Sequence, residues 1–258
     1  MKLTTGAEPL RAPGIAFDGT NLLIVWREGP GSPPYGVWGV IVSPSLSVVV
    51  GSPRGFSISA TGRYPWTAFD GTNYIVGWRD ERNAATTGQD VYAARVTKTG
   101  NVLDPSGIVI CNAPGDQGTP SVASNGGVTL LAWEDPRQSD QWNLGSAWAA
   151  RMNASGAVYD PNGFLIGPYA HDQPPVVAVS YGSGFLVTWM YAAGGNDFRL
   201  SDAMAVRVTT AGTVADAVPL VLGGSHGHEW APTIAAAGSR FIAAWNESLT
   251  DRCWDECV

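Results

Sequence analysis

Apolar and polar positions alternate along this chain in short runs that end in turn residues. A clear example is Trp66-Thr67-Ala68-Phe69, followed by the pair Asp70-Gly71 and the apolar run Tyr74-Ile75-Val76-Gly77-Trp78. An Asp-Gly pair between two apolar runs is a strong hairpin signal, because glycine adopts positive φ without steric cost. A helical repeat would need apolar positions about 3.6 residues apart and few glycines, and neither is present. The pattern therefore predicts short antiparallel strands.

The same pattern returns five times along the chain. Prolines recur at spacings of 52, 55, 55 and 57 residues, at Pro13, Pro65, Pro120, Pro175 and Pro232. Tryptophans recur at spacings of 52, 55, 56 and 56 residues, at Trp26, Trp78, Trp133, Trp189 and Trp245. Each repeat has room for four short strands, with a polar loop of variable length between the second and the third. Four antiparallel strands in a repeat of roughly 40–55 residues are typical of a β-propeller blade.

We therefore predict an all-β fold, a single five-bladed β-propeller over residues 1–258 with four antiparallel strands per blade. The blades cover residues of about 13–64, 65–119, 120–174, 175–231, and 232–258 together with 1–12. The last repeat stops after its third strand, and residues 3–11 stand before the first proline in the place of a fourth strand. Pairing of these two segments closes the ring, and a closed ring leaves no unpaired strand edge.

The repeats resemble bacterial β-propeller repeats of the Ala-Phe-Asp-Gly-Thr-Asn-Tyr-x-Val-x-Trp type over nearly the whole chain, most clearly at residues 68–78. They are distantly similar to TolB-type blades. The predicted number of blades resembles that of the tachylectin-2 lectin and of the five-bladed glycosidases. The resemblance implies the fold and no particular activity, because propellers host many functions.

Composition and charge narrow the possible partners. Acidic residues outnumber basic ones by 22 to 15 and the net charge is −7, which argues against nucleic acid or an anionic membrane as a partner. No run of eighteen apolar residues predicts a membrane span. The glycine-rich, lysine-poor composition favours a secreted or cell-surface bacterial protein whose signal peptide is absent from this chain, with an intracellular protein as the alternative. A closed ring predicts a monomer.

Candidate binding residues gather in two sets of loops. Loops before the first strand and between the second and third strands share one face of a propeller, around the mouth of its central channel, and loops commonly carry function. The polar and aromatic residues expected to bind ligand there are Arg63, Tyr64, Trp66, Arg79, Asp80, Gln117, Glu134, Asp135, His171, Gln173, Tyr191, Trp230 and Glu247. The recurring charged residues also fit ion pairs between neighbouring blades. The repeated tryptophans are expected in the core.

A possible metal site stands at His226, His228 and Glu229. Two imidazoles and a carboxylate can bind Zn²⁺ or another divalent ion. The spacing is a weak signal, and ordinary surface residues are the alternative. No other cofactor is predicted.

The sequence favours a binding module over an enzyme. The predicted innermost strands contain no acid, whereas a glycosidase needs paired carboxyl groups beside its substrate. A Gly-x-Ser-x-Gly nucleophile motif and a phosphate-binding glycine loop are also absent. We therefore expect a non-catalytic, lectin-like module that binds a carbohydrate or another small polar ligand through loops around the channel. A protein-interaction scaffold and a metal-dependent hydrolase centred on His226 are the alternatives.

Overall fold

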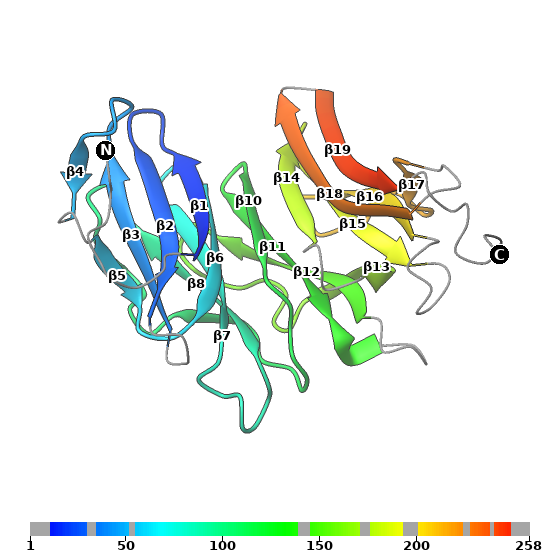
Figure 1. Cartoon of the computed structure of the whole chain (residues 1–258), viewed down its shortest axis with the longest axis horizontal. Coiled ribbons are helices and arrows are strands. Elements are labelled where there is room, and N and C mark those ends of the chain that lie inside the picture. Colours follow the sequence, from blue (N-terminus) through cyan, green and yellow to red (C-terminus); the bar gives the residue numbers. More distant parts are fainter. Residues whose placement is uncertain are drawn as a thin grey trace, which may run out of the picture.

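The computed structural model describes residues 11–29, 35–51, 55–138, 145–170, 176–192, 201–223, 228–237 and 240–248. Within these ranges the chain forms antiparallel β-sheets and one short 3₁₀ turn, Pro136–Gln138. No helix in this part of the chain is long and apolar enough to cross a membrane. Figure 1 shows successive sheets arranged side by side. The predicted all-β fold with antiparallel four-stranded sheets is therefore confirmed.

The strands follow the predicted repeats, and each unit begins with its innermost strand. The first unit contains β1 (Arg11–Phe17), β2 (Leu22–Glu28), β3 (Gly36–Val42), β4 (Val48–Val50) and β5 (Phe56–Ser59). The second contains β6 (Arg63–Phe69), β7 (Tyr74–Asp80), β8 (Asp90–Val96) and β9 (Ile108–Cys111). The third contains β10 (Ser121–Asn125), β11 (Val128–Asp135), β12 (Gly145–Asn153) and β13 (Phe164–Ala170). The fourth contains β14 (Val177–Tyr181), β15 (Gly184–Ala192), β16 (Ser201–Thr209) and β17 (Leu220–Val221), and β18 (His228–Ala237) and β19 (Arg240–Ser248) follow.

The innermost strands lie next to one another in chain order, as β1, β6, β10, β14 and β18 (Figure 1). Completing the last sheet would require residues 1–10 and 249–258, which lie outside the described residues. The five-bladed count and the closed ring therefore stay predictions.

The apolar core lies between consecutive sheets. Trp78, Trp133 and Trp189 are fully buried, each between its own sheet and the preceding one. The expected core position of the repeated tryptophans is thereby confirmed for these three units. Truncating a ring in such a layer typically costs about 3–5 kcal/mol.

A glycine packs against the buried ring in successive units. Gly163 has φ +81°, and a Cβ at this position would lie 2.6 Å from the Trp133 ring. Gly107 has φ +75° and faces the Trp78 ring in the same way, at 3.1 Å. Both the positive φ and the close approach of the ring favour glycine here.

Arginines on the third strands join one unit to the next. Arg95 donates to both carboxylate oxygens of Asp104 at 2.9 Å, and its Nη1 donates to the Ala154 carbonyl of the following unit at 3.2 Å. Arg151 repeats this arrangement with Asp160 and with the Thr210 carbonyl, the latter at 3.0 Å. A charged donor that satisfies a carboxylate and a carbonyl of the next unit stabilises the stacking of sheets.

Arg207 repeats only the first part of this arrangement. It forms an ion pair with Asp216, and its side chain is 56% exposed against 18% for Arg95 and 16% for Arg151. Among the described residues, no carbonyl oxygen of a following unit accepts a hydrogen bond from the Arg207 guanidinium. Within the described ranges, the fourth unit therefore lacks the joint that links the second and third units to their successors.

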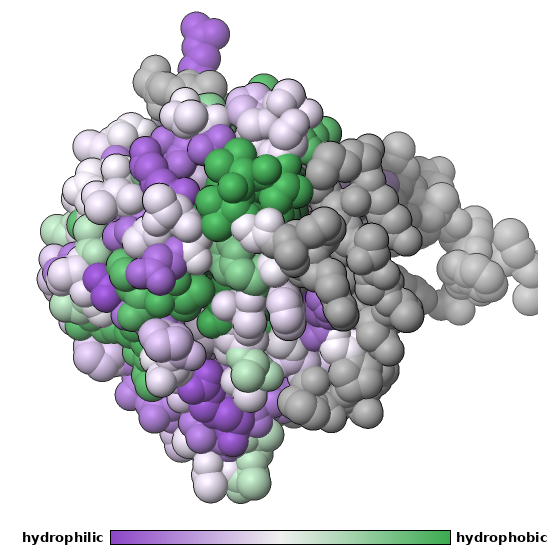
Figure 2. Space-filling view, turned by 90° about the vertical axis from the view of Figure 1, so that its left-hand side faces the viewer, coloured by the Kyte–Doolittle hydropathy of each residue, from purple (hydrophilic) through white to green (hydrophobic). Residues whose placement is uncertain are grey.

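Apolar side chains are exposed at the two ends of the row of sheets. Ile15 and Phe17 of β1 are 60% and 54% exposed, and Ile242 of β19 is 76% exposed. Phe69, the repeat equivalent of Phe17, instead packs into the layer between the first two sheets, 5.3 Å from the Tyr74 ring. Figure 2 views the molecule from the side of the first unit and shows apolar surface among polar residues.

The last innermost strand begins earlier than the sequence suggested. We expected residues 226–230 in a loop and the strand after Pro232, whereas β18 starts at His228 and continues through a register shift between Trp230 and Thr233. Glu229 therefore lies on an innermost strand. The expectation that these strands contain no acid is wrong for β18.

Candidate functional site

Strand direction places the candidate residues at one end of the sheets. In the second unit Arg63 lies opposite Arg79, and Asp80 lies opposite Asp90. First and third strands begin at this end, and second strands finish there. We call it the mouth end, and Arg95 lies near the opposite end of β8.

Two arginines and two tyrosines meet at the mouth end of the first and second units. The Arg27 guanidinium carbon lies 4.2 Å from the centre of the Tyr35 ring, and that of Arg63 lies 5.6 Å from the same centre. Arg63 also lies 5.9 Å from the Tyr64 ring and forms an ion pair with Glu81. We call these five residues the arginine cluster. Sequence reasoning selected Arg63 and Tyr64 as ligand contacts but not the other three, because the members come from separate strands and loops.

A bulge in β6 sets the orientation of Arg63. The register of β6 and β7 shifts between Arg63 and Trp66, and Tyr64 adopts φ +53°. Pro65 follows directly, and proline lacks the amide hydrogen that a regular ladder needs. Bulges of this kind redirect side chains at sheet ends, often beside functional sites.

Trp66 lies within β6 rather than in a loop. It is partly buried and packs against two apolar clusters. One lies between the second and third sheets, and the other includes Val177 of β14 and Ile234 of β18. Trp66 therefore fills space between the innermost strands. It packs beneath the residues at the mouth end and is not one of the loop residues there.

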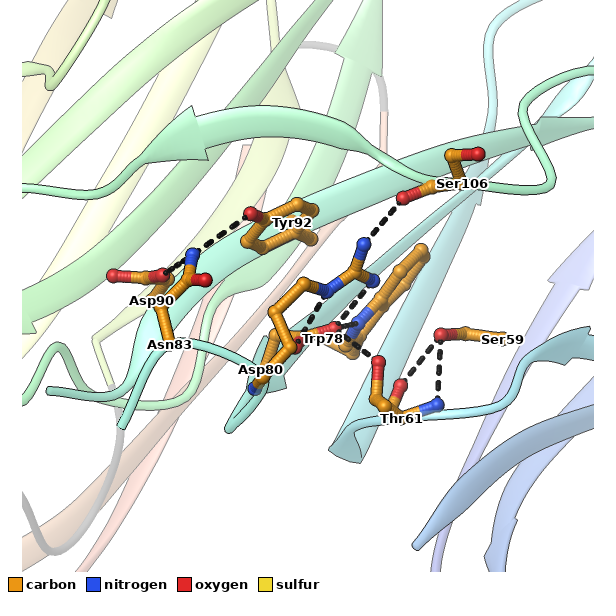
Figure 3. Close-up of polar contacts among 9 residues, drawn as sticks. Ser59, Thr61, Trp78, Asp80, Asn83, Asp90, Tyr92 and Ser106 are labelled. Carbon is orange, nitrogen blue, oxygen red and sulfur yellow. Dashed lines mark hydrogen bonds and ion pairs between the residues drawn. The ribbon is translucent and has the colours of Figure 1, made fainter. Parts of the chain in front are cut away.

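Asp80 is saturated by hydrogen bonds (Figure 3). Arg82 donates through Nε and Nη2 at 2.9 and 2.8 Å, the Trp78 indole donates at 2.7 Å, and the Thr61 hydroxyl donates at 2.9 Å. Burial alone would raise the pKa of Asp80, but these hydrogen bonds outweigh it and lower the pKa. A fully buried carboxylate with this many donors anchors the loop after β7.

Asp135 repeats the arrangement in the third unit. Arg137 donates to it at 2.8 Å through both Nε and Nη2, and the Trp133 indole donates at 2.9 Å. Both ion pairs lie within one unit, so they differ from the expected pairs between blades. The shared pattern Trp-x-Asp-x-Arg indicates that these two carboxylates hold the loop in place.

Asp90 has the opposite environment. Its side chain is fully buried, one oxygen accepts from the Asn83 amide at 2.8 Å, and the other has no partner among the described residues (Figure 3). Burial raises the pKa of Asp90, and the charge of nearby Asp80 adds to the effect. Sequence reasoning did not identify this residue as a candidate.

Gln117 and Glu134 are buried at the mouth end of the third unit. The Gln117 amide donates to the carbonyls of Ala113 and Gly115 at 3.0 and 2.9 Å. Glu134 packs close to Gly145, where a Cβ would collide with its carboxylate. These contacts fix both side chains within the unit.

The remaining candidates are spread over the fourth and fifth units. Tyr191 is partly buried against the layer between the third and fourth sheets, and Glu247 lies opposite Glu229. The Glu229 carboxylate is buried and accepts from the Ala203 amide at 3.0 Å. The structure therefore does not bring Tyr191 or Glu247 into the arginine cluster.

The proposed metal ligands are only partly described. Three candidates lie outside the described residues: His226, His171 and Gln173. The backbone of His228 and Trp230 is described, but their side chains are not. Within the described part of the chain, no three His, Cys, Asp or Glu side chains are grouped as metal ligands. The metal site stays a prediction.

A hollow of about 320 Å³ lies at the opposite end of the fourth unit, lined in part by Tyr181, Phe185 and Arg207. In the third unit the equivalent place beside Arg151 is taken by Gly212 of the next unit's turn. The hollow therefore corresponds to a packing position between units, and it is separate from the mouth end.

Comparisons with known proteins place the fold. No protein-family model matches the sequence, and no curated protein matches it. A subtype N10 neuraminidase-like protein of A/little yellow-shouldered bat/Guatemala/060/2010 matches 80% of this chain and 58% of its own, with 12% identity and a TM-score of 0.51. The β-fructofuranosidase BmSUC1 of Bombyx mori matches 91% of this chain and 55% of its own, with 10% identity and a TM-score of 0.52. A Synechocystis apocarotenoid oxygenase matches 90% of this chain and 54% of its own, with 15% identity and a TM-score of 0.51.

The comparisons identify a propeller-like fold. The chain spans little more than half the length of these three proteins. At 15% identity or less, the similarity extends to the fold alone. Enzymes that act on carbohydrates predominate among the similar structures, which include further glycoside hydrolases. This finding contradicts the expected non-catalytic, lectin-like function, and that expectation is corrected.

Proposed function

We propose that this propeller is an enzyme that cleaves glycosidic bonds at the mouth end of its first and second units. The observation that carries the proposal is the placement of Glu81. Its side chain is 16% exposed, directly after β7, and is ion-paired with Arg63 at the start of innermost strand β6. A carboxylate near the protein surface is the kind of group that serves as a nucleophile or a general base in glycoside cleavage.

The neighbouring residues fit a carbohydrate substrate. The partly exposed Tyr64 offers an aromatic ring that can pack against a sugar, whereas Tyr35 is buried and supports the two arginines. Glycoside cleavage also needs a carboxyl group that protonates the departing oxygen. We assign this role to Glu28, which ends β2 beside Arg27 and is partly exposed. The names of the enzymes that share the fold favour the same substrate class.

The test is a hydrolysis screen with the full chain. Reducing-sugar release from a panel of polysaccharides is measured for the native protein, Glu81→Gln and Glu28→Gln. We expect each variant to lose at least 100-fold in kcat while keeping its fold by circular dichroism. Asp104→Asn is the matched control, because it disrupts an Arg–carboxylate pair at the opposite end. Hydrolysis that survives both glutamine variants, or no hydrolysis on any polysaccharide, would refute the proposal.

We also propose that the ring has five blades and closes when residues 1–10, which precede β1, complete the last one. The exposure of Phe17, whose equivalent Phe69 is packed, supports a missing neighbour on the first sheet. A monomer in a secreted or cell-surface setting accords with a closed ring and the lysine-poor composition.

A further inference from the structure

Arg27 is a buried cation with no anionic partner in the part of the chain that the structure describes. Only 8% of the residue is exposed, and its Nε is buried with no hydrogen-bond acceptor among the described residues. Its described neighbour is the Tyr35 ring, 4.2 Å from the guanidinium carbon. Burying a charge without a partner is costly, since cation–π contact replaces only part of its hydration. Such a group indicates an anion that is supplied from outside the protein.

A second arginine faces the same ring. Arg63 lies 5.6 Å from the Tyr35 centre and its Nε is also buried without an acceptor. Its ion pair with Glu81 balances one positive charge, so Arg27, Arg63 and Glu81 together carry a formal charge of +1. Backbone register adds a third arginine position at this end, because Arg11 lies opposite Arg27.

We propose that the arginine cluster binds the carboxylate of an acidic sugar. This inference rests on the proposed function and names the substrate class. Guanidinium groups recognise carboxylates through paired N–H donors, and a planar monoanion matches the excess of one charge. The partly exposed Tyr64 ring then lies beside the sugar that carries the carboxylate. A sulfate or phosphate ester shares the anionic chemistry and is distinguished by the probes below.

The experiment measures binding apart from catalysis. Isothermal calorimetry with the full chain uses D-glucuronate and D-galacturonate as probes, with D-glucose and D-galactose as neutral controls and glucose 6-sulfate and glucose 6-phosphate as the other anions. We expect binding of at least one uronate and at least tenfold weaker binding of its neutral counterpart and of both esters. Binding should weaken with added salt, because the attraction is partly electrostatic.

Variants locate the site. Arg27→Met should weaken uronate binding at least tenfold, whereas Lys98→Met, which removes a cation at the opposite end, should leave it unchanged. Glu81→Gln should strengthen uronate binding, because Arg63 loses its competing partner, although hydrolysis is lost. Equal binding of uronate and neutral sugar, preference for an ester, or full uronate affinity in Arg27→Met would overturn the inference. Neutral-glycan hydrolysis without uronate binding would leave the proposed function standing, and uronate binding without any hydrolysis would leave the anion site standing.

Discussion

Asp80 and Asp90 lie opposite each other on paired strands, yet replacement by asparagine should affect them in opposite ways. Both side chains are fully buried. Asp80 is held by Arg82, Trp78 and Thr61, so Asp80→Asn leaves the partly exposed Arg82 without its counter-charge and weakens the acceptor of the buried Trp78 indole. Losing hydrogen bonds to a charged group typically costs about 1.5–3 kcal/mol. Asp90 has one amide donor and one unsatisfied oxygen, so Asp90→Asn removes an unfavourable buried charge at a cost near zero.

The pH dependence of the two carboxyls also has opposite signs. The pKa of Asp80 is lowered from its ordinary value of 3.8, so its stabilisation is present above 3.8 and is lost as pH falls through the folded-state pKa. The pKa of Asp90 is raised, so its contribution is greatest below 3.8 and declines as pH rises through the folded-state pKa. Asp90→Asn should abolish this decline.

The assay is urea unfolding followed by tryptophan fluorescence between pH 3 and pH 8. The free energy of unfolding at pH 7 should fall by about 1.5–3 kcal/mol in Asp80→Asn and stay level or rise in Asp90→Asn. The advantage of Asp90→Asn over the native protein should grow as pH rises from 3.8. Equal losses in both variants at pH 7 would show that burial alone, rather than the partners of each carboxylate, decides the outcome.

Three further predictions concern the packing of units. Arg151→Met should destabilise the protein by about 1.5–3 kcal/mol, because a charged hydrogen bond to the next unit is lost, whereas Arg207→Met should have a much smaller effect; equal urea midpoints would contradict this. Gly163→Ala should lower the free energy of unfolding by about 2–4 kcal/mol, because the new Cβ would press on the Trp133 ring. The matched control is Gly71→Ala, which has φ +99° but no atom near the new Cβ and should cost about 1 kcal/mol. Similar thermal midpoints for the two variants would show that contact with the ring is unimportant. Deleting residues 1–10, which leaves β1 intact, should lower the thermal midpoint if they complete the last blade, and an unchanged midpoint would argue against ring closure.

The strands and the core could be predicted from local sequence signals. The Asp70-Gly71 turn and the repeated tryptophans depend on residues that are neighbours in the chain, so a single repeat contains the information. The structural role of Asp80 and Asp135 was also visible, since both stand two residues after a tryptophan and two before an arginine.

The site was harder to predict because it depends on geometry between separate strands. The contact of Arg27 with Tyr35 and Arg63 brings together the ends of β2, β3 and β6, and no spacing in the sequence encodes it. The position of Glu229 was missed because a bulge carries β18 past Pro232, whereas a proline normally suggests the boundary of a strand. The correction of the function has a related cause, since the search for catalytic carboxylates was confined to the inner strands, and the charged loop residues, Glu81 among them, were interpreted as ion pairs.

The hydrogen bonds through which third-strand arginines join the units all run from one unit to the next along the chain. Arg95 and Arg151 each donate to the unit that follows, and each unit so contacted offers a carbonyl to the one before. A duplicated repeat would bring its own donor and its own acceptor, so it could be inserted without any new contact having to evolve. Gene duplication could thus lengthen or shorten an array of this kind by whole repeats while its joints stayed intact.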